Sequence, residues 1–173
     1  MKKTLIVIDM QHDFIDGPLG TAAARAIVPN VQKKIEEYVA SGDNIIFTRD
    51  THHENYYDTQ EGRLLPVEHC MEMTPGLCIH KDIQSQFGTE IIDKHNFGYH
   101  AWYGYRNLLN VDRVEIVGVC TDICVITNAL LIKTEFPEVN IRVDASCCAG
   151  TTPENHQAAL AVMDSCQIHI VNN

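Results

Sequence analysis

Residues 114–125, with the sequence VEIVGVCTDICV, decide the fold of this chain. Their apolar run ends at Gly118, a short polar turn follows, and an amphipathic segment continues to Lys133. This order is typical of a buried strand that passes through a tight turn into a helix. Cys124 is then expected in the first helical turn, where unpaired N–H groups favour a thiolate over a thiol. These residues alone leave open whether Cys124 is a nucleophile or a small buried side chain of the core.

Outward from this stretch, short apolar segments alternate with amphipathic ones. Strands are predicted at residues 5–8, 44–48, 90–93, 113–117, 139–143 and 167–171, and helices at 29–40, 102–109, 122–133 and 153–166. Such alternation predicts an α/β fold, a three-layer Rossmann-like arrangement with a mainly parallel central sheet flanked by helices. Residues 50–88 show little periodicity, and a loop of that length inside a domain is usually functional.

The composition limits the classes of function. A chain of 173 residues with 45% hydrophobic residues is expected to form a single domain, residues 1–173, around one substantial core. The net charge of −10 argues against nucleic acid as a partner, and the absence of a long uncharged apolar span argues against the membrane. The apolar run at the N-terminus is too short for a signal peptide. With an odd count of seven cysteines, these features favour a cytoplasmic protein with reduced thiols.

Polar side chains stand where several predicted strands end. Asp9, Asp50 and Lys94 follow three of them, and Cys124 follows the fourth after its turn. Ligands of parallel sheets bind outside the carboxyl ends of the strands, so these groups are expected at one edge. A carboxylate can take the proton of a cysteine nucleophile, and an ammonium can stabilise the thiolate. Taken singly, however, Asp9 also suits a cap and Lys94 a solvated charge.

The loop after Asp50 is rich in potential metal ligands. Asp50 and His52 lie two residues apart on an extended segment, which points both side chains to one side, and Glu61 and His69 follow. Nitrogen and oxygen ligands without thiolates suit zinc, manganese or iron(II). The alternative is a solvated loop in which His53, His80 and Glu68 offer similar combinations.

A third set is apolar and aromatic. Such side chains can form the walls of a pocket for a flat ring, although aromatic residues are more often part of the core. The set comprises Phe14, Leu65, Tyr99, Trp102 and Tyr103.

Five motifs in this order carry a resemblance that spans nearly the whole chain: LIVIDMQHDF, TRDTHH, LPVEHC followed by TPG, GVCTDICV and VDASCCAG. The sequence resembles the isochorismatase-like cysteine hydrolases, and within them the nicotinamidase/pyrazinamidase branch. This resemblance implies that the fold is that of the family and that the protein is a metal-dependent amidohydrolase. Its substrate would be a small-molecule amide, and a homo-oligomer is compatible with the sequence.

The resemblance also implies roles for single residues. Cys124 matches the nucleophile, Asp9 the general base and acid, and Lys94 the cation between them. The bond Val119–Cys120 matches a cis peptide that aims the backbone N–H groups of Cys120 and Cys124 at the developing oxyanion. One divalent metal ion, zinc in the first place and otherwise manganese or iron, would be held by Asp50, His52 and His69, with Glu61 matching a fourth ligand of some members. Phe14 matches a position that contacts the substrate ring, and we expect Leu65, Tyr99 and Trp102 beside it in the pocket.

The implied reaction converts nicotinamide to nicotinate and ammonia through a thioester on Cys124. A related amidase for a ureido or carbamoyl compound is the alternative. Isochorismate hydrolysis and a non-catalytic metal or thiol sensor are weaker alternatives, because the sequence has Asp9, Lys94 and Cys124 together with the metal set. Three features depart from the family pattern. Cys120 replaces the usual alanine, and Leu65 replaces an aromatic residue. The spacing from Glu61 to His69 is one residue longer than in the members that have the glutamate ligand.

Overall fold

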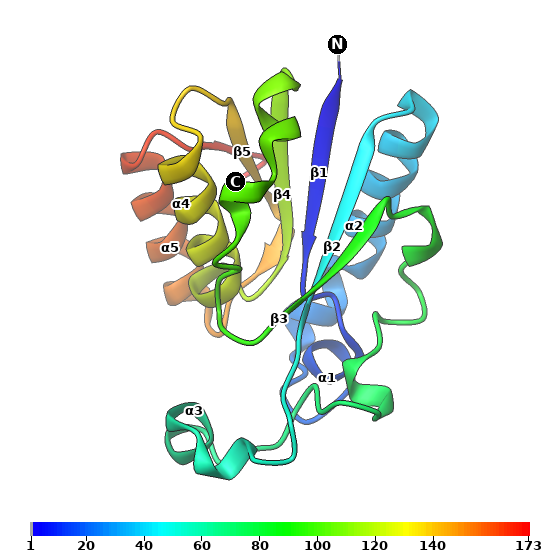
Figure 1. The fold of residues 1–173 in the computed structure, drawn as a ribbon, viewed down its shortest axis with the longest axis vertical. Coiled ribbons are helices and arrows are strands. Elements are labelled where there is room, and N and C mark those ends of the chain that lie inside the picture. The colour runs from blue at the N-terminus through cyan, green and yellow to red at the C-terminus, as the bar shows by residue number, and fades with distance from the viewer. Residues whose placement is uncertain (1) are drawn as a thin grey trace.

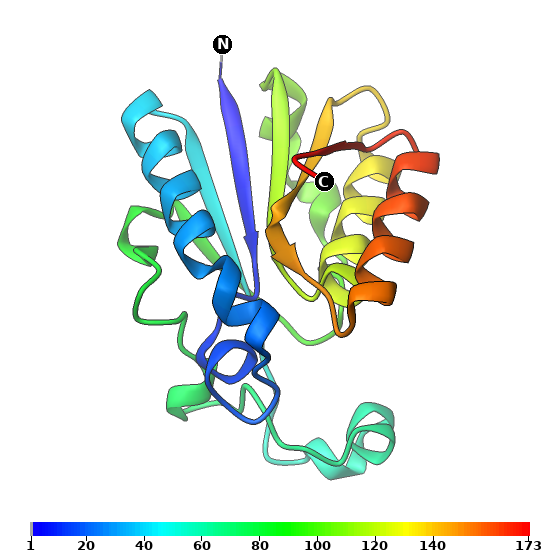
Figure 2. The ribbon, with the colours of Figure 1, turned by 180° about the vertical axis from the view of Figure 1, so that it is seen from behind.

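The computed structural model describes residues 2–173, and within them six parallel strands form one sheet in the order β3-β2-β1-β4-β5-β6. Figure 1 shows the strands side by side, and Figure 2, seen from behind, shows helix α2 (Ala22–Ser41) in front of the sheet. The strands are β1 (Lys3–Ile8), β2 (Asn44–Asp50), β3 (Glu90–Lys94), β4 (Arg113–Val119), β5 (Ile141–Ala149) and β6 (His169–Val171). The predicted α/β class and three-layer arrangement are therefore confirmed.

The core lies on both faces of the sheet because successive side chains of a buried strand point in opposite directions. On β1, Ile6 and Ile8 pack with α4 (Ile126–Glu135) and α5 (Pro153–Ser165). Leu5 and Val7 pack on the other side with α2 (Ala22–Ser41). All four side chains are fully buried. A strand without a polar face can only lie at the centre of such a sheet.

Helix α2 begins seven residues earlier than predicted, at Ala22 rather than at Pro29. The Thr21 hydroxyl caps it by accepting the Ala24 N–H at 3.0 Å. Pro29 lies in the interior of this helix, where it lacks the N–H that would bond the preceding turn. The prediction was wrong because proline is typical of a first helical turn, whereas here the packed apolar face of the helix outweighs one lost hydrogen bond.

Four other segments differ from the prediction. Residues 12–15, expected as loop, form the short helix α1 (His12–Ile15), and the loop 50–88 contains α3 (Gln60–Leu64), which stands beyond the carboxyl ends of the strands in Figure 1. Residues 102–109 form two 3-10 turns, Trp102–Gly104 and Arg106–Asn110, instead of one helix. Strand β5 continues to Ala149, because its small side chains fit a closely covered part of the sheet. Among residues 2–173, no helix has the length and apolar character required to span a bilayer.

Candidate active site and metal centre

The carboxyl ends of four adjacent strands bring the predicted groups together. Strand β1 ends before Asp9, β2 ends at Asp50, β3 ends at Lys94, and β4 leads to the turn that carries Cys124. Because β3, β2, β1 and β4 are neighbours in the sheet, four residues distant in sequence meet at one edge. This confirms the expected gathering, which follows from parallel topology alone.

Lys94 is the centre of this group. Its side chain is buried, and its Nζ lies 2.7 Å from Asp9 Oδ2, 3.6 Å from Cys124 Sγ and 3.4 Å from Asp50 Oδ1. The other oxygen of Asp9 accepts the Thr48 hydroxyl at 2.6 Å. Burial alone would lower the pKa of Lys94, but Asp9, Cys124 and Asp50 outweigh it and raise that pKa. The ammonium is therefore a fixed positive charge between a carboxyl group and a thiol.

Burial has the opposite consequence for the two partners of Lys94. It raises the pKa of the Cys124 thiol, and it raises the pKa of the Asp9 carboxyl, although Lys94 lowers both. Burial therefore opposes the thiolate that the turn was expected to favour, because removal of the sulfur from water is the largest contribution to the pKa of Cys124. Residues Thr121–Val125 form a single π-helical turn ahead of α4, and Cys124 lies within it.

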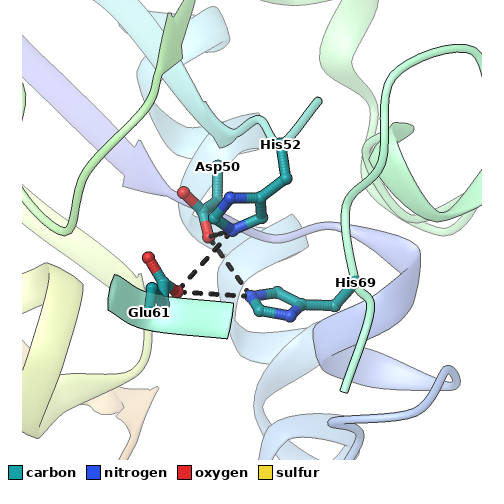
Figure 3. A group of neighbouring side chains, drawn as sticks. All are labelled: Asp50, His52, Glu61 and His69. Atoms are coloured by element: carbon teal, nitrogen blue, oxygen red, sulfur yellow. Dashed lines mark hydrogen bonds and ion pairs between the residues drawn. The ribbon is translucent and has the colours of Figure 1, made fainter. Parts of the chain in front are cut away.

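Four side chains converge beside this group, as Figure 3 shows. The donor atoms of Asp50, His52, Glu61 and His69 all lie within 4.8 Å of one another. Asp50 Oδ2 is 3.0 Å from His52 Nε2 and 3.6 Å from His69 Nε2, and Glu61 Oε1 is 3.7 Å from both imidazole nitrogens. Four donors at metal-ligand distance in a tetrahedron lie about 3.4 Å apart. The residues present therefore fit one divalent metal ion, and Glu61 belongs to the set.

The close approach of these donors shifts the pKa values of Asp50 and His69. Burial would raise the pKa of Asp50, but the neighbouring imidazoles of His52 and His69 and the charge of Lys94 hold it far below its usual range. Burial would lower the pKa of His69, but Asp50 raises it. His69 Nδ1 lies 2.8 Å from the Val67 carbonyl. With the proton on Nδ1, that contact directs the lone pair of Nε2 toward Asp50 and Glu61.

A cavity of about 300 Å³ connects the two groups. It is lined by Phe14, Leu19, Thr21, Asp50, Glu61, Leu65, His69, Phe97, Cys120, Ile123, Cys124 and Thr151. The structure thus places Phe14 and Leu65 on its wall, as expected. It also places Phe97 there, which sequence reasoning missed even though this residue follows Lys94 by three positions.

The structure places Tyr99 and Trp102 elsewhere, and their assignment to the pocket is wrong. Neither residue lines the cavity. Trp102 is buried in the core with Tyr99 packed against it, and its ring Nε1–H donates to Asn128 Oδ1 at 2.9 Å. The segment that carries them docks on α4, where Asn128 accepts the N–H of Tyr99 and the ring N–H of Trp102. Tyr103, the remaining member of the aromatic set, is exposed.

The turn before Cys124 has two backbone features. The peptide bond Val119–Cys120 is cis, as predicted. Gly118 has a φ of 122°, and a Cβ at this position would collide with the carbonyl oxygen of Ile8 on the neighbouring strand. Only glycine therefore lets β4 approach β1 this closely while the chain turns.

Comparison with known proteins gives the family. The family model described as "Isochorismatase domain" matches residues 3–172. The chain belongs to the isochorismatase family. Among solved structures, pyrazinamidase of Pyrococcus horikoshii in complex with zinc is similar with a TM-score of 0.85 and 28% identity over all of both chains.

Two further proteins are similar to this chain along most of their length. The nicotinamidase/pyrazinamidase of Mycobacterium tuberculosis is 24% identical over 98% of each chain. The structure of N-carbamoylsarcosine amidase from Thermoplasma acidophilum has a TM-score of 0.79 and 26% identity, covering 98% of this chain and 95% of the other. The family relationship thus joins this chain to proteins named for amide hydrolysis.

In this family member, the motif that begins at Asp9 also supports the metal centre. The Gln11 side chain accepts the Asp50 N–H at 2.7 Å and donates to the Asp50 carbonyl at 2.8 Å. Asp13 Oδ2 accepts the N–H of Cys70, the residue after His69, at 2.9 Å. Because all three bonds join the loop after the first strand to residues distant in sequence, Gln11 and Asp13 fix the backbone at or next to two of the four clustered donors, Asp50 and His69.

Proposed function

We propose that this protein is a metal-dependent nicotinamidase that converts nicotinamide to nicotinate and ammonia. The observation that carries the proposal is that Cys124, in contact with Lys94 and through it with Asp9, lines the same cavity as three of the four clustered donors, Asp50, Glu61 and His69. The relatives named nicotinamidase or pyrazinamidase support it. A pyridine carboxamide offers the two features such a cavity requires, a flat ring with a lone pair and an amide carbon.

In the first half of the proposed reaction, Cys124 Sγ attacks the amide carbon and its proton passes to Asp9. Lys94 stabilises the negative charge while it is shared between the two partners. The backbone N–H groups of Cys120 and Cys124 would donate to the oxyanion that forms. Asp9 then gives its proton to the amide nitrogen, the C–N bond breaks, and ammonia leaves a thioester on Cys124.

In the second half, water replaces ammonia. Asp9, now a carboxylate, takes a proton from a water molecule that attacks the thioester carbon. The C–S bond breaks, Asp9 passes this proton to Cys124, and the product leaves as nicotinic acid, which releases the second proton of the water to solvent and becomes nicotinate. At the end of the cycle Cys124 is again a thiol and Asp9 is again a carboxylate, as at the start.

The donors Asp50, His52, Glu61 and His69 would hold one divalent ion, for which we propose zinc, with manganese or iron as alternatives. When bound, the ion supplies a Lewis acid for the ring nitrogen of the substrate, which positions the ring without contacting the bond that breaks. Phe14 and Leu65 would contact the faces of the ring. We also propose that residues 1–173 act as one cytoplasmic domain.

Ammonia release from nicotinamide by the zinc-loaded protein tests the proposal. We expect Cys124→Ala to abolish it, whereas Cys166→Ala, which alters an exposed thiol far along the chain, leaves it unchanged. Adding a chelator should slow the reaction and adding zinc should restore it. Full activity of Cys124→Ala would refute the mechanism.

A carbamoyl or ureido amide is the second candidate substrate. It is favoured by one observation, the similarity to the N-carbamoylsarcosine amidase structure. Both candidates require the same three residues, so only the substrate separates them. Ammonia from an N-carbamoyl amino acid, with none from nicotinamide, would keep the mechanism and replace the substrate.

A further inference from the structure

Asn128 of α4 is a fully buried amide whose four hydrogen-bonding positions are all used. Its Oδ1 accepts the backbone N–H of Tyr99 and the ring N–H of Trp102, each at 2.9 Å. Its Nδ2 donates to the carbonyl of Phe97 at 3.1 Å and to the carbonyl of Cys124 at 2.7 Å. A carboxamide has two donors and two acceptor lone pairs, so this side chain is saturated.

Three of these bonds hold residues 95–102 against α4. This segment connects β3 to the 3-10 turn Trp102–Gly104. Gly98 shows how close the contact is, because a Cβ there would lie 2.5 Å from Leu131 Cδ1 and 2.6 Å from Thr127 Cγ2. The segment contributes two groups to the site. Phe97 lines the cavity, and the carbonyl of Asn96 accepts the Lys94 ammonium at 3.1 Å.

The fourth bond reaches the turn that carries the thiol. The carbonyl that accepts this bond belongs to Cys124 itself, inside the π-helical turn that precedes the regular α-helix. One side chain therefore joins the backbone of Cys124 to the backbone of Phe97, a second residue that lines the cavity. Elsewhere on α4, the inward-facing positions Ala129 and Ile132 are apolar, as a helix that needs only burial requires.

We propose that Asn128 is a positioning residue, which holds the backbones of Cys124 and Phe97 at a fixed separation in the lining of the cavity, so that the carbonyl carbon of a flat amide substrate lies at the sulfur. This rests on the proposed amidase function for its kinetic consequence. The physical reason is that a fully satisfied buried polar network specifies one arrangement, whereas apolar packing tolerates several. A displacement of the reacting atoms by about 1 Å can cost roughly a hundredfold in rate.

Two variants and one control test the proposal. Asn128→Leu removes all four bonds, and Asn128→Asp keeps the two acceptor bonds while losing the donors to Phe97 and Cys124. Ile132→Ala, one turn further along the buried side of the same helix, lowers stability without touching the network. Each zinc-loaded protein is compared at the same interval below its own Tm, so that global destabilisation is matched.

The first readout needs no substrate. The rate at which iodoacetamide alkylates Cys124 is followed by mass spectrometry, and we expect it to rise several-fold in both Asn128 variants and to stay unchanged in Ile132→Ala. The second readout is nicotinamide hydrolysis, in which Asn128→Leu should lower kcat by about a hundredfold and raise KM, with Ile132→Ala near the parent values.

Alkylation rates and kinetic constants that change equally in Asn128→Leu and Ile132→Ala would overturn the proposal and leave Asn128 a structural residue. If Asn128→Leu does not fold, Asn128→Asp decides by the same two readouts. A parent protein inactive on nicotinamide would refute the proposed function, but the alkylation rates would still decide the role of Asn128.

Discussion

Replacing Lys94 by methionine gives the sharpest test of how the site is held together. The substitution keeps most of the side-chain volume and removes an ammonium whose exposed fraction is 2%. That ammonium lies 2.7 Å from Asp9 Oδ2 and 3.4 Å from Asp50 Oδ1. Breaking a buried ion pair by removing one partner costs about 3–5 kcal/mol, because the other charge is left uncompensated. For a chain of this length, a loss of that size lowers Tm by roughly 6–20 °C.

The assay is urea unfolding followed by circular dichroism, with excess zinc present so that the metal compensates Asp50 in every variant. The matched control is Lys81→Met, because the Lys81 side chain is largely exposed and pairs only with its exposed neighbour Asp82. We expect this control to change the free energy of unfolding by less than about 1 kcal/mol. The double variant Lys94→Met/Asp9→Asn should be more stable than Lys94→Met alone, since it removes the stranded charge.

The loss of stability caused by Lys94→Met is expected to depend on pH. Burial raises the pKa of Asp9 even beside Lys94, and without the ammonium that pKa can only rise further. The folded state then binds a proton that the unfolded state has released, so stability is retained at acidic pH and lost as pH rises through the folded pKa. The penalty for Lys94→Met should therefore shrink as pH is lowered from 8 toward 5. A double variant no more stable than Lys94→Met, with a penalty independent of pH, would refute the reasoning.

Three further outcomes are expected. Asp50→Asn should reduce the zinc content of purified protein, measured by atomic emission, because it removes a charged donor; unchanged content would exclude Asp50 as a ligand. Thr152→Ala should cost about 1 kcal/mol in urea unfolding, since the Thr152 hydroxyl accepts the Asn155 N–H at the start of α5, and a loss near zero would contradict this capping role. Lys34 holds the pKa of Asp144 below its usual range, so this carboxylate contributes stability above its unfolded pKa that is lost as pH falls. Asp144→Asn should thus flatten the acid side of the stability profile, and an unchanged slope there would count against the Lys34 pair.

Much of the fold was predictable because its central strands are apolar on both faces. Leu5 to Ile8 cannot lie at a solvated edge, and this fixes a covered parallel sheet before any contact is known. Helix beginnings were less predictable. Pro29 is a strong signal for a helix start, yet the cap at Thr21 lies earlier, because local preference yields to the packing of residues whose partners lie far along the chain.

The residues expected at the site also fall into those that the sequence could place and those that it could not. Asp9, Asp50 and Lys94 could be placed together because topology gathers strand ends, whatever the loops do. Tyr99 and Trp102 could not be placed, because their position depends on which surface the segment 95–102 docks against. That surface is chosen by hydrogen bonds to Asn128, and no local pattern marks that residue as a partner.

The raised pKa of Cys124 does not prevent the proposed chemistry, because the proton's destination is buried as well. What governs attack is the difference between the proton affinities of Cys124 and Asp9, and burial raises both of their pKa values. Lys94 lies within 3.6 Å of each partner, so the negative charge moves from one side of the ammonium to the other and the net charge of the site stays constant. A thiol that stays protonated until a substrate fills the cavity resists stray electrophiles and oxidants, since the thiolate is the reactive form. Burial of the whole group therefore serves selectivity, provided that acid, base and cation are buried together.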